Sequence, residues 1–156
     1  MMRSDLSHQP LPDIRFFQSK TGILECDDSN WPLAIVLGEE APSLAAHRHF
    51  LERWMTWLDR SRPFVLLRIY ANPEALIEPP GAAAETAAWL TVNGEKVRAL
   101  VAGIAASAPP SHLDRLAPQE LKRFGVPARM FDSSRTAVAW LREEILAPIG
   151  LRIDTL

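Results

Sequence analysis

Uniformly apolar runs alternate along the chain with stretches in which apolar residues recur every three or four positions. Residues 33–37 and 64–70 are too short for helices and apolar almost throughout, which predicts strands buried on both faces. Between them, residues 43–60 carry apolar side chains at helical spacing, and Ser43 is of a type that caps helix N-termini. The order strand, helix, strand is typical of a parallel sheet with crossover helices.

The second half of the chain repeats this order. Alanine-rich residues 82–93 predict a helix that the following Asn-Gly pair weakens or ends, and residues 97–105 predict another buried strand. We expect a helix over residues 111–124 and a short strand at the sheet edge over residues 127–131. A last helix then follows and ends at Pro148.

Two short β-prone runs near the start of the chain, residues 14–17 and 23–26, surround a polar turn and predict a hairpin. We expect residues 27–32 to form a loop after it. The full order is then β-β-β-α-β-α-β-α-β-α, an α/β fold with a single mostly parallel sheet, an N-terminal antiparallel hairpin and helices packed on the sheet. The predicted organisation is a flexible N-terminal tail (1–12), a single domain (13–150) and a C-terminal tail (151–156).

Composition narrows the class of protein. With 156 residues, 47% of them hydrophobic, the chain is long enough for one ordinary globular core. Its net charge of −2 lacks the basic excess of proteins that coat nucleic acid, so we expect no nucleic-acid partner. The one cysteine, Cys26, excludes an internal disulfide and a cysteine-based zinc site. We find neither a signal-peptide core nor an apolar run that would span a bilayer, which predicts a cytoplasmic protein without a membrane partner.

No arrangement of reactive side chains in the sequence predicts catalysis. His47 and His49 lie two positions apart on a predicted helix and point about 200° from each other, so they share no metal ion. Ser111, His112 and Asp114 fall on one helical turn, whereas a catalytic triad draws its groups from separate elements. The glycines are too far apart for a phosphate-binding or dinucleotide-binding loop. We therefore expect no enzyme activity, no metal and no cofactor.

The five tryptophans divide into two groups. Trp54, Trp89 and Trp140 lie on the apolar sides of three predicted helices, which indicates core packing. Trp31 lies in a predicted loop, and Trp57 drifts off the apolar stripe of its helix toward the boundary. Because tryptophan is enriched at interfaces, an exposed side chain at either position would mark a contact surface.

Arg68 is the one charged residue in the strand predicted over residues 64–70. A buried guanidinium needs an anionic partner, since an unpaired buried charge is costly. We predict a structural ion pair with Glu74 or Glu78, which follow the strand. The binding of an anionic ligand is the second interpretation of this arginine.

Four segments together resemble a known family. A strand that begins Arg62-Pro63-Phe64 follows a tryptophan-bearing helix, and after it come the helix around Trp89, the strand at 96–105 and the closing strand and helix at 126–141. In this order they resemble the bacterial SpoIIAA-like proteins, the STAS or anti-sigma-factor-antagonist group in its broad sense. The resemblance covers residues 14–147 and is one of pattern, not of a signature motif.

The resemblance implies a non-enzymatic regulatory or scaffolding domain that acts through protein–protein contacts, with an unknown protein partner or as a homodimer. Regulated members of the family are phosphorylated on a hydroxyl at the start of the helix after the central strand. Here no hydroxyl precedes Thr86 in that region, which counts against such a switch. The contact surface that we predict consists of Trp31, Trp57, Asn72, Glu74 and Glu78.

A small-molecule binding domain is the alternative function. The small side chains of the alanine-rich helix at 82–93 leave room between that helix and the sheet. A pocket there would take an apolar ligand.

Overall fold

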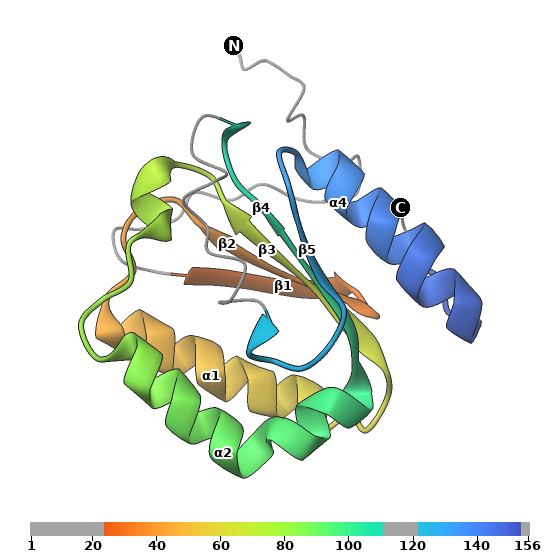
Figure 1. Cartoon of the computed structure of the whole chain (residues 1–156), viewed down its shortest axis with the longest axis horizontal. Helices are drawn as coiled ribbons and strands as arrows, with labels where there is room; N and C mark the ends of the chain where they lie inside the picture. The colour runs from red at the N-terminus through yellow and green to blue at the C-terminus, as the bar shows by residue number, and fades with distance from the viewer. Residues whose placement is uncertain (1–23, 111–121, 154–156) are drawn as a thin grey trace.

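The computed structural model describes residues 24–110 and 122–153, which form a five-stranded mixed sheet with helices on both faces (Figure 1). The strands lie side by side in chain order, with the bounds Leu24–Asn30 (β1), Leu33–Gly38 (β2), Phe64–Tyr70 (β3), Val101–Ser107 (β4) and Ala128–Phe131 (β5). β1 pairs with β2 antiparallel, and all the other pairs are parallel. The prediction of an α/β fold with a mostly parallel sheet is confirmed. The antiparallel pair that the structure describes is β1 with β2, whereas the predicted hairpin pairs residues 23–26 with residues 14–17, which lie outside the described residues.

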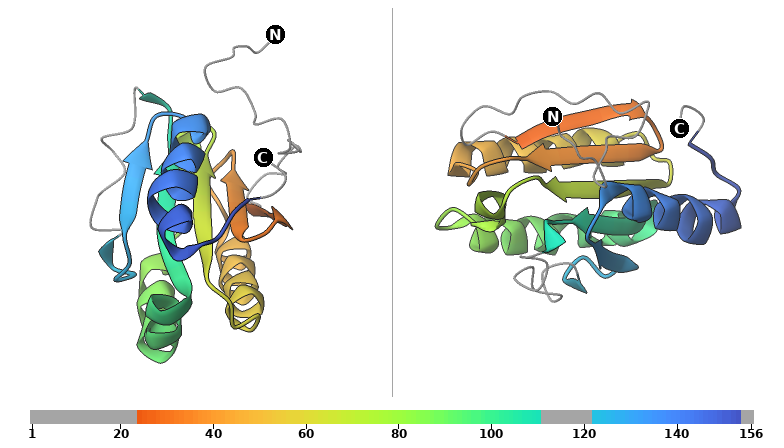
Figure 2. Two further views of the ribbon diagram at one scale, coloured as in Figure 1. Left: turned by 90° about the vertical axis from the view of Figure 1, so that its right-hand side faces the viewer. Right: turned by 90° about the horizontal axis from the view of Figure 1, so that it is seen from above.

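The helices divide between the two faces of the sheet. On one face lie α1 and α2, and on the other lies the C-terminal helix (Figure 2). Their bounds are Leu44–Leu58 (α1), Ala82–Leu100 (α2) and Ser134–Trp140 (α4), and α4 continues as the π-helical turn Leu141–Leu146 (η3) and the 3₁₀ turn Ala147–Ile149 (η4). The predicted N-cap of the first helix is confirmed, because the Ser43 side chain accepts a hydrogen bond from the Ala46 N–H at 3.0 Å.

The central strand β3 shows how the apolar pattern serves both faces. Val65, Leu67 and Ile69 pack toward α4, whereas Phe64 and Leu66 pack toward α1 and α2. This alternation follows from the two-residue period of a strand. The same period places Arg68 and Tyr70 on the α1 and α2 side, at the carboxyl end of the strand.

Two predicted boundaries in the middle of the chain are wrong. α2 does not end at its Asn-Gly pair but runs on to Leu100, with Gly94 buried inside it. A glycine costs a helix about 1 kcal/mol relative to alanine, and the good helix formers that follow it offset this cost. Val97 is therefore a buried helical residue, and β4 begins at Val101 instead of at residue 97.

The N-terminal region departs from its prediction in another way. β1 runs through to Asn30, so the loop expected over residues 27–32 shrinks to a tight turn at Trp31 and Pro32. β1 pairs directly with β2, because backbone pairing with a buried strand outweighs the turn preference of its polar residues. The tail predicted at 1–12, the strand at 14–17 and most of the helix at 111–124 lie outside the described residues.

Candidate ligand pocket

A pocket of about 310 Å³ opens on the α1 and α2 side of the sheet, at the carboxyl end of β3. Its floor comes from β3 and β4, its walls from α1 and the start of α2, and its rim from the loop that carries the 3₁₀ turn Pro73–Leu76 (η1). Ligands of open α/β sheets bind beyond the carboxyl ends of the strands, and this volume falls within the range of small-molecule sites.

Aromatic side chains make up much of the pocket wall. Phe50 and Trp54 contribute from α1, Tyr70 from β3, and Phe124 from the segment that leads to β5. The rings of Trp54 and Phe124 stack with centroids 5.6 Å apart and an angle of 8° between their planes. Trp54 also contacts the ring of Trp89 on α2 at 5.5 Å, so the wall is rigidly packed.

Arg68 rises from the floor of this pocket, half-buried among the rings. Its guanidinium carbon lies 4.7 Å from the centre of the Tyr70 ring and 5.1 Å from that of the Phe50 ring. Its buried Nε–H has no hydrogen-bond acceptor, and across the part of the chain that the structure describes Arg68 has no ion pair. The predicted ion pair with Glu74 or Glu78 is therefore wrong: Glu74 lies exposed in η1.

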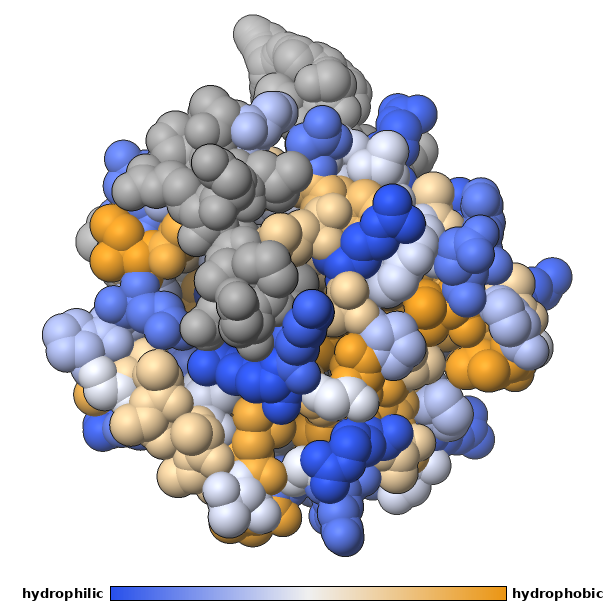
Figure 3. Space-filling model, viewed as in Figure 1, coloured by the Kyte–Doolittle hydropathy of each residue, from blue (hydrophilic) through white to orange (hydrophobic). Residues whose placement is uncertain are grey.

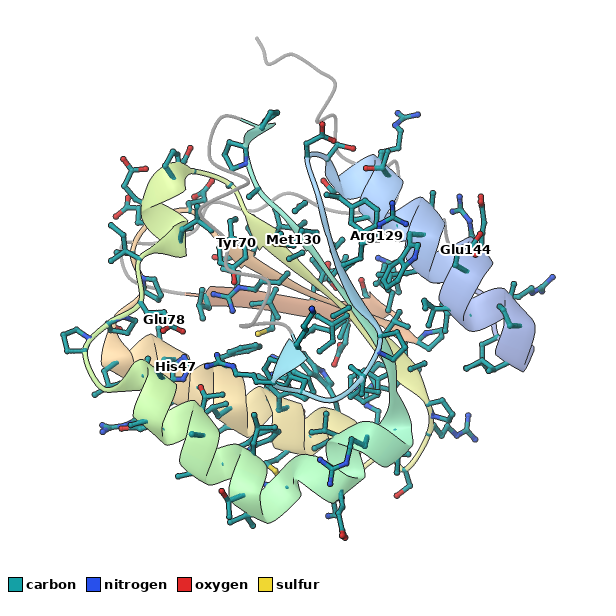
Figure 4. The ribbon with its side chains drawn as sticks, viewed as in Figure 1. His47, Tyr70, Glu78, Arg129, Met130 and Glu144 are labelled. Carbon is teal, nitrogen blue, oxygen red and sulfur yellow. The ribbon has the colours of Figure 1, made fainter. Side chains whose placement is uncertain are left out.

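Glu78 instead faces another arginine at the rim. Its Oε2 lies 3.8 Å from Nη2 of Arg123, and this pair connects the loop before α2 with the segment before β5. In Figure 4, Glu78 and His47 lie close together at one end of α1, with Tyr70 above them at the end of β3. Arg129 and Glu144 lie away from this group, beside α4.

Trp54 adds a second buried donor to the pocket. Its side chain is fully buried, and its Nε1–H has no acceptor among the described residues. Indole N–H groups usually find a partner when they are buried, because an unpaired donor keeps the cost of losing water. Trp54 and Arg68, each with a buried N–H group that has no acceptor among the described residues, thus line the same pocket.

A buried histidine closes the pocket where α1 meets α2. His47 Nε2 lies 2.8 Å from Oγ1 of Thr86, and both side chains are buried. Burial lowers the pKa of His47 below its usual value, and the charges of Arg68 and Arg123 lower it further. His47 is therefore neutral at pH 7, and it leaves the two arginines as the cations facing the pocket.

A second cluster of tryptophan, arginine and acidic side chains lies on β1, beside the turn that connects β1 to β2. Here one carboxylate oxygen of Asp28, on β1, accepts hydrogen bonds from Trp57 Nε1 at 3.1 Å and from Arg60 at 2.8 Å. Arg53 lies 3.4 Å from the same oxygen. Arg60 also covers the ring of Trp31, with 4.1 Å from its guanidinium carbon to the ring centre. The cluster ties the turn between β1 and β2 to the end of α1.

The structure separates the residues of the predicted contact surface. Trp31 lies half-buried at the amino end of β2, stacked on Phe64 at 4.9 Å. Trp57 is fully buried, so the expectation that it lies at the helix boundary is wrong. Asn72, Glu74 and Glu78 follow the carboxyl end of β3, roughly 20 Å away along the strands.

The sequence indicates Arg68 as a candidate site residue but does not indicate the residues around it. The pattern predicts Trp54 as a core residue, and it marks neither Arg123 nor Phe124 as a neighbour of β3. The predicted pocket lies between the sheet and the helix at residues 82–93. The observed pocket lies mostly beside α1 and the carboxyl end of β3, and Thr86 is the α2 residue in its lining.

No family model, no curated protein and no solved structure matches this chain. Within residues 24–110 and 122–153, no three histidine, cysteine or acidic side chains are grouped to hold a metal ion. The described helices include none with the length and apolar character needed to cross a membrane.

Proposed function

We propose that this chain is a binding domain for a small molecule with an apolar body, which it holds in the pocket at the carboxyl end of β3. The observation that carries the proposal is the pocket itself, about 310 Å³ with aromatic walls and two buried donors that lack acceptors among the described residues. Sites for small molecules combine an apolar lining with a few polar groups that orient the ligand. The pocket has this composition.

The proposal is for binding and includes no reaction. The Thr86 hydroxyl is 2.8 Å from His47 Nε2, and both side chains are buried. We assign this pair the role of holding α1 against α2. Arg48 and Glu85 reinforce the same contact from outside, with an ion pair of 2.6 Å.

Native mass spectrometry of the purified chain tests the proposal, because it reports a retained ligand and the oligomeric mass together. Leu76→Trp is the variant that fills the pocket: Leu76 lines the rim and is half-buried, so a larger side chain there disturbs the core little. We expect Leu76→Trp to lose the ligand that the unmodified chain retains. Ile149→Trp is the matched control, since Ile149 is 50% exposed in η4 and does not line the pocket.

A function through protein–protein contacts is the second candidate, as the resemblance to SpoIIAA-like or STAS-like proteins implies. The observation that favours it is the outer face of α2, where Val92 is 80% exposed and neighbouring alanines are exposed as well. Weakly hydrophobic side chains gather at the lower left of Figure 3, where this helix runs. We take a second copy of the chain as the partner, because the small side chains on this face let two copies of the helix pack closely against each other.

Light scattering tests this second candidate. A dimer mass that Val92→Glu reduces to that of the monomer supports contact through α2. A monomer at every concentration removes it. The predicted contact residues remain Trp31, Asn72, Glu74 and Glu78. The cytoplasmic location also remains a prediction.

A further inference from the structure

We infer that the ligand of this pocket carries a carboxylate on its apolar body and that the Arg68 guanidinium binds this carboxylate. The inference rests on the proposed function and names the chemical class of the ligand. It starts from a half-buried arginine in the pocket floor, whose Nε–H lacks an acceptor and which forms no ion pair with any residue that the structure describes.

The charges around the pocket favour an anion. Arg68 and Arg123 both line it, and both act electrostatically on His47. Glu78 is the acidic residue of the lining, and it lies at the rim, 3.8 Å from Arg123. A cation held away from water gains most from a partner of opposite charge, and no protein carboxylate supplies one to Arg68 in the described part of the chain.

The surroundings of Arg68 select a planar anion. The rings of Phe50 and Tyr70 lie 5.1 and 4.7 Å from its guanidinium carbon, so a ligand must bond to the N–H groups of the guanidinium. Guanidinium and carboxylate are both planar and form two parallel hydrogen bonds. The apolar part of the ligand then lies against the ring of Phe124.

Other arginines of the described chain have carboxylate partners. Asp28 accepts hydrogen bonds from Arg60 and Trp57, and Glu85 accepts from Arg48. Arg68 has no such partner among the described residues, and it lines a cavity of ligand size.

The test uses pairs of probes that differ only in charge. We would titrate the purified chain with aryl and alkyl carboxylates of increasing length, such as 4-phenylbutyrate and octanoate, and with the primary amide of each, by calorimetry at pH 7. We expect the best carboxylate to bind roughly ten- to hundredfold more tightly than its amide, as a charged hydrogen-bonded pair provides.

Two variants locate the preference. Arg68→Met keeps the length and apolar stem of the side chain, and we expect it to bind the carboxylate and the amide equally. Arg129→Met is the matched control, because Arg129 is also a strand arginine against an aromatic ring, 5.3 Å from Phe131, but lies outside the pocket. Arg129→Met should keep the full preference, and the melting temperature of each variant shows that it is folded.

Each other outcome has a definite meaning. Equal binding of carboxylate and amide by the unmodified chain overturns the inference and leaves the proposed function standing. Binding of acetate or chloride as tightly as the best probe also overturns it, because the site would then take an inorganic or minimal anion without an apolar body. If no probe binds and native mass spectrometry finds no retained ligand, the proposed function fails, and the inference fails with it.

Discussion

Two tryptophans lie one helical turn apart on α1, and both are fully buried, yet their indole nitrogens are treated differently. Trp57 Nε1 donates to Asp28 at 3.1 Å, whereas Trp54 Nε1 has no acceptor among the described residues. The nearby arginines repeat the contrast, since Arg60 bonds to Asp28 at 2.8 Å while Arg68 has no ion pair in the described chain.

The difference separates a structural cluster from a binding site. The Asp28 cluster is closed, because one carboxylate meets the donors that surround it and fastens β1 to α1. The pocket differs, because Trp54 and Arg68 line a cavity and their buried N–H groups have no acceptor among the described residues. Buried donors without partners cost free energy, and active and binding sites are where proteins keep such cost. Stability measurements on matched variants therefore distinguish the two regions.

Asp28→Ala should produce the greatest loss of stability. It leaves Trp57 Nε1 and Arg60 without their acceptor, and we expect the free energy of unfolding to fall by roughly 2–4 kcal/mol. Urea unfolding measures it. Asp27→Ala is the control: in the described chain the Asp27 side chain bonds to Ser29, two residues along β1, so its loss should stay below about 1 kcal/mol. Equal losses of unfolding free energy in the two variants would show that the Asp28 cluster does not stabilise the fold.

The two tryptophans can be compared directly by Trp→Phe substitution. Trp57→Phe and Trp54→Phe remove the same ring atoms from fully buried positions on one helix. Only Trp57→Phe also removes a hydrogen bond to a carboxylate, so we expect it to cost about 1–2 kcal/mol more than Trp54→Phe in chemical denaturation. A larger cost for Trp54→Phe would mean that its indole nitrogen has a structural partner.

Arg68→Met should act in the opposite direction on stability. Replacing a half-buried cation that lacks an ion pair by an apolar side chain of similar length removes a desolvation cost, and we expect a gain of about 1 kcal/mol. The thermal midpoint of the ligand-free chain reports it. A clear loss of stability would make Arg68 a structural residue and would remove the contrast with the Asp28 cluster.

His47 gives the smallest effect, as a dependence of stability on pH. Its pKa is lowered in the folded chain, chiefly by burial and then by the charge of Arg68, so the unfolded chain binds more protons just below pH 6.5. Stability from this residue is thus complete above pH 6.5 and is lost as the pH falls through the lowered pKa. His47→Gln should flatten this slope in unfolding measured from pH 7 to 5, whereas His49→Gln, at an exposed position, should not.

Arg68→Met also tests this electrostatic account. Removal of the Arg68 charge should raise the pKa of His47, which an NMR titration of its ring protons follows. An unchanged pKa would show that burial alone controls this histidine.

Most of the α/β architecture is readable in the sequence. The apolar runs at β2 and β3 and the helical stripe of α1 give the correct elements, and the crossover rule then requires parallel pairing. The end of α2 was not predictable from its Asn-Gly pair, because the residues after Gly94 suit a helix and a buried strand alike. Packing of Val97 against the sheet decides between them.

The candidate site was predictable only in part. A charge inside an apolar strand marks Arg68. The prediction of Glu74 and Glu78 as its partners rests only on their position after the strand in the chain. Glu78 in fact faces Arg123, 45 positions further along, and only the tertiary contact reveals that pairing.

Local pattern therefore accounts for the α/β class and for most of the described strands and helices, because periodicity and capping depend on residues a few positions apart. Whether a buried donor finds an acceptor depends on distant segments: Asp28 meets Trp57 and Arg60 from 29 and 32 positions away. The same long-range packing leaves Arg68 and Trp54 lining a cavity. The chain thus carries most of its fold in its local pattern, while the contrast between a closed cluster and an open pocket arises only when the sheet brings distant side chains together.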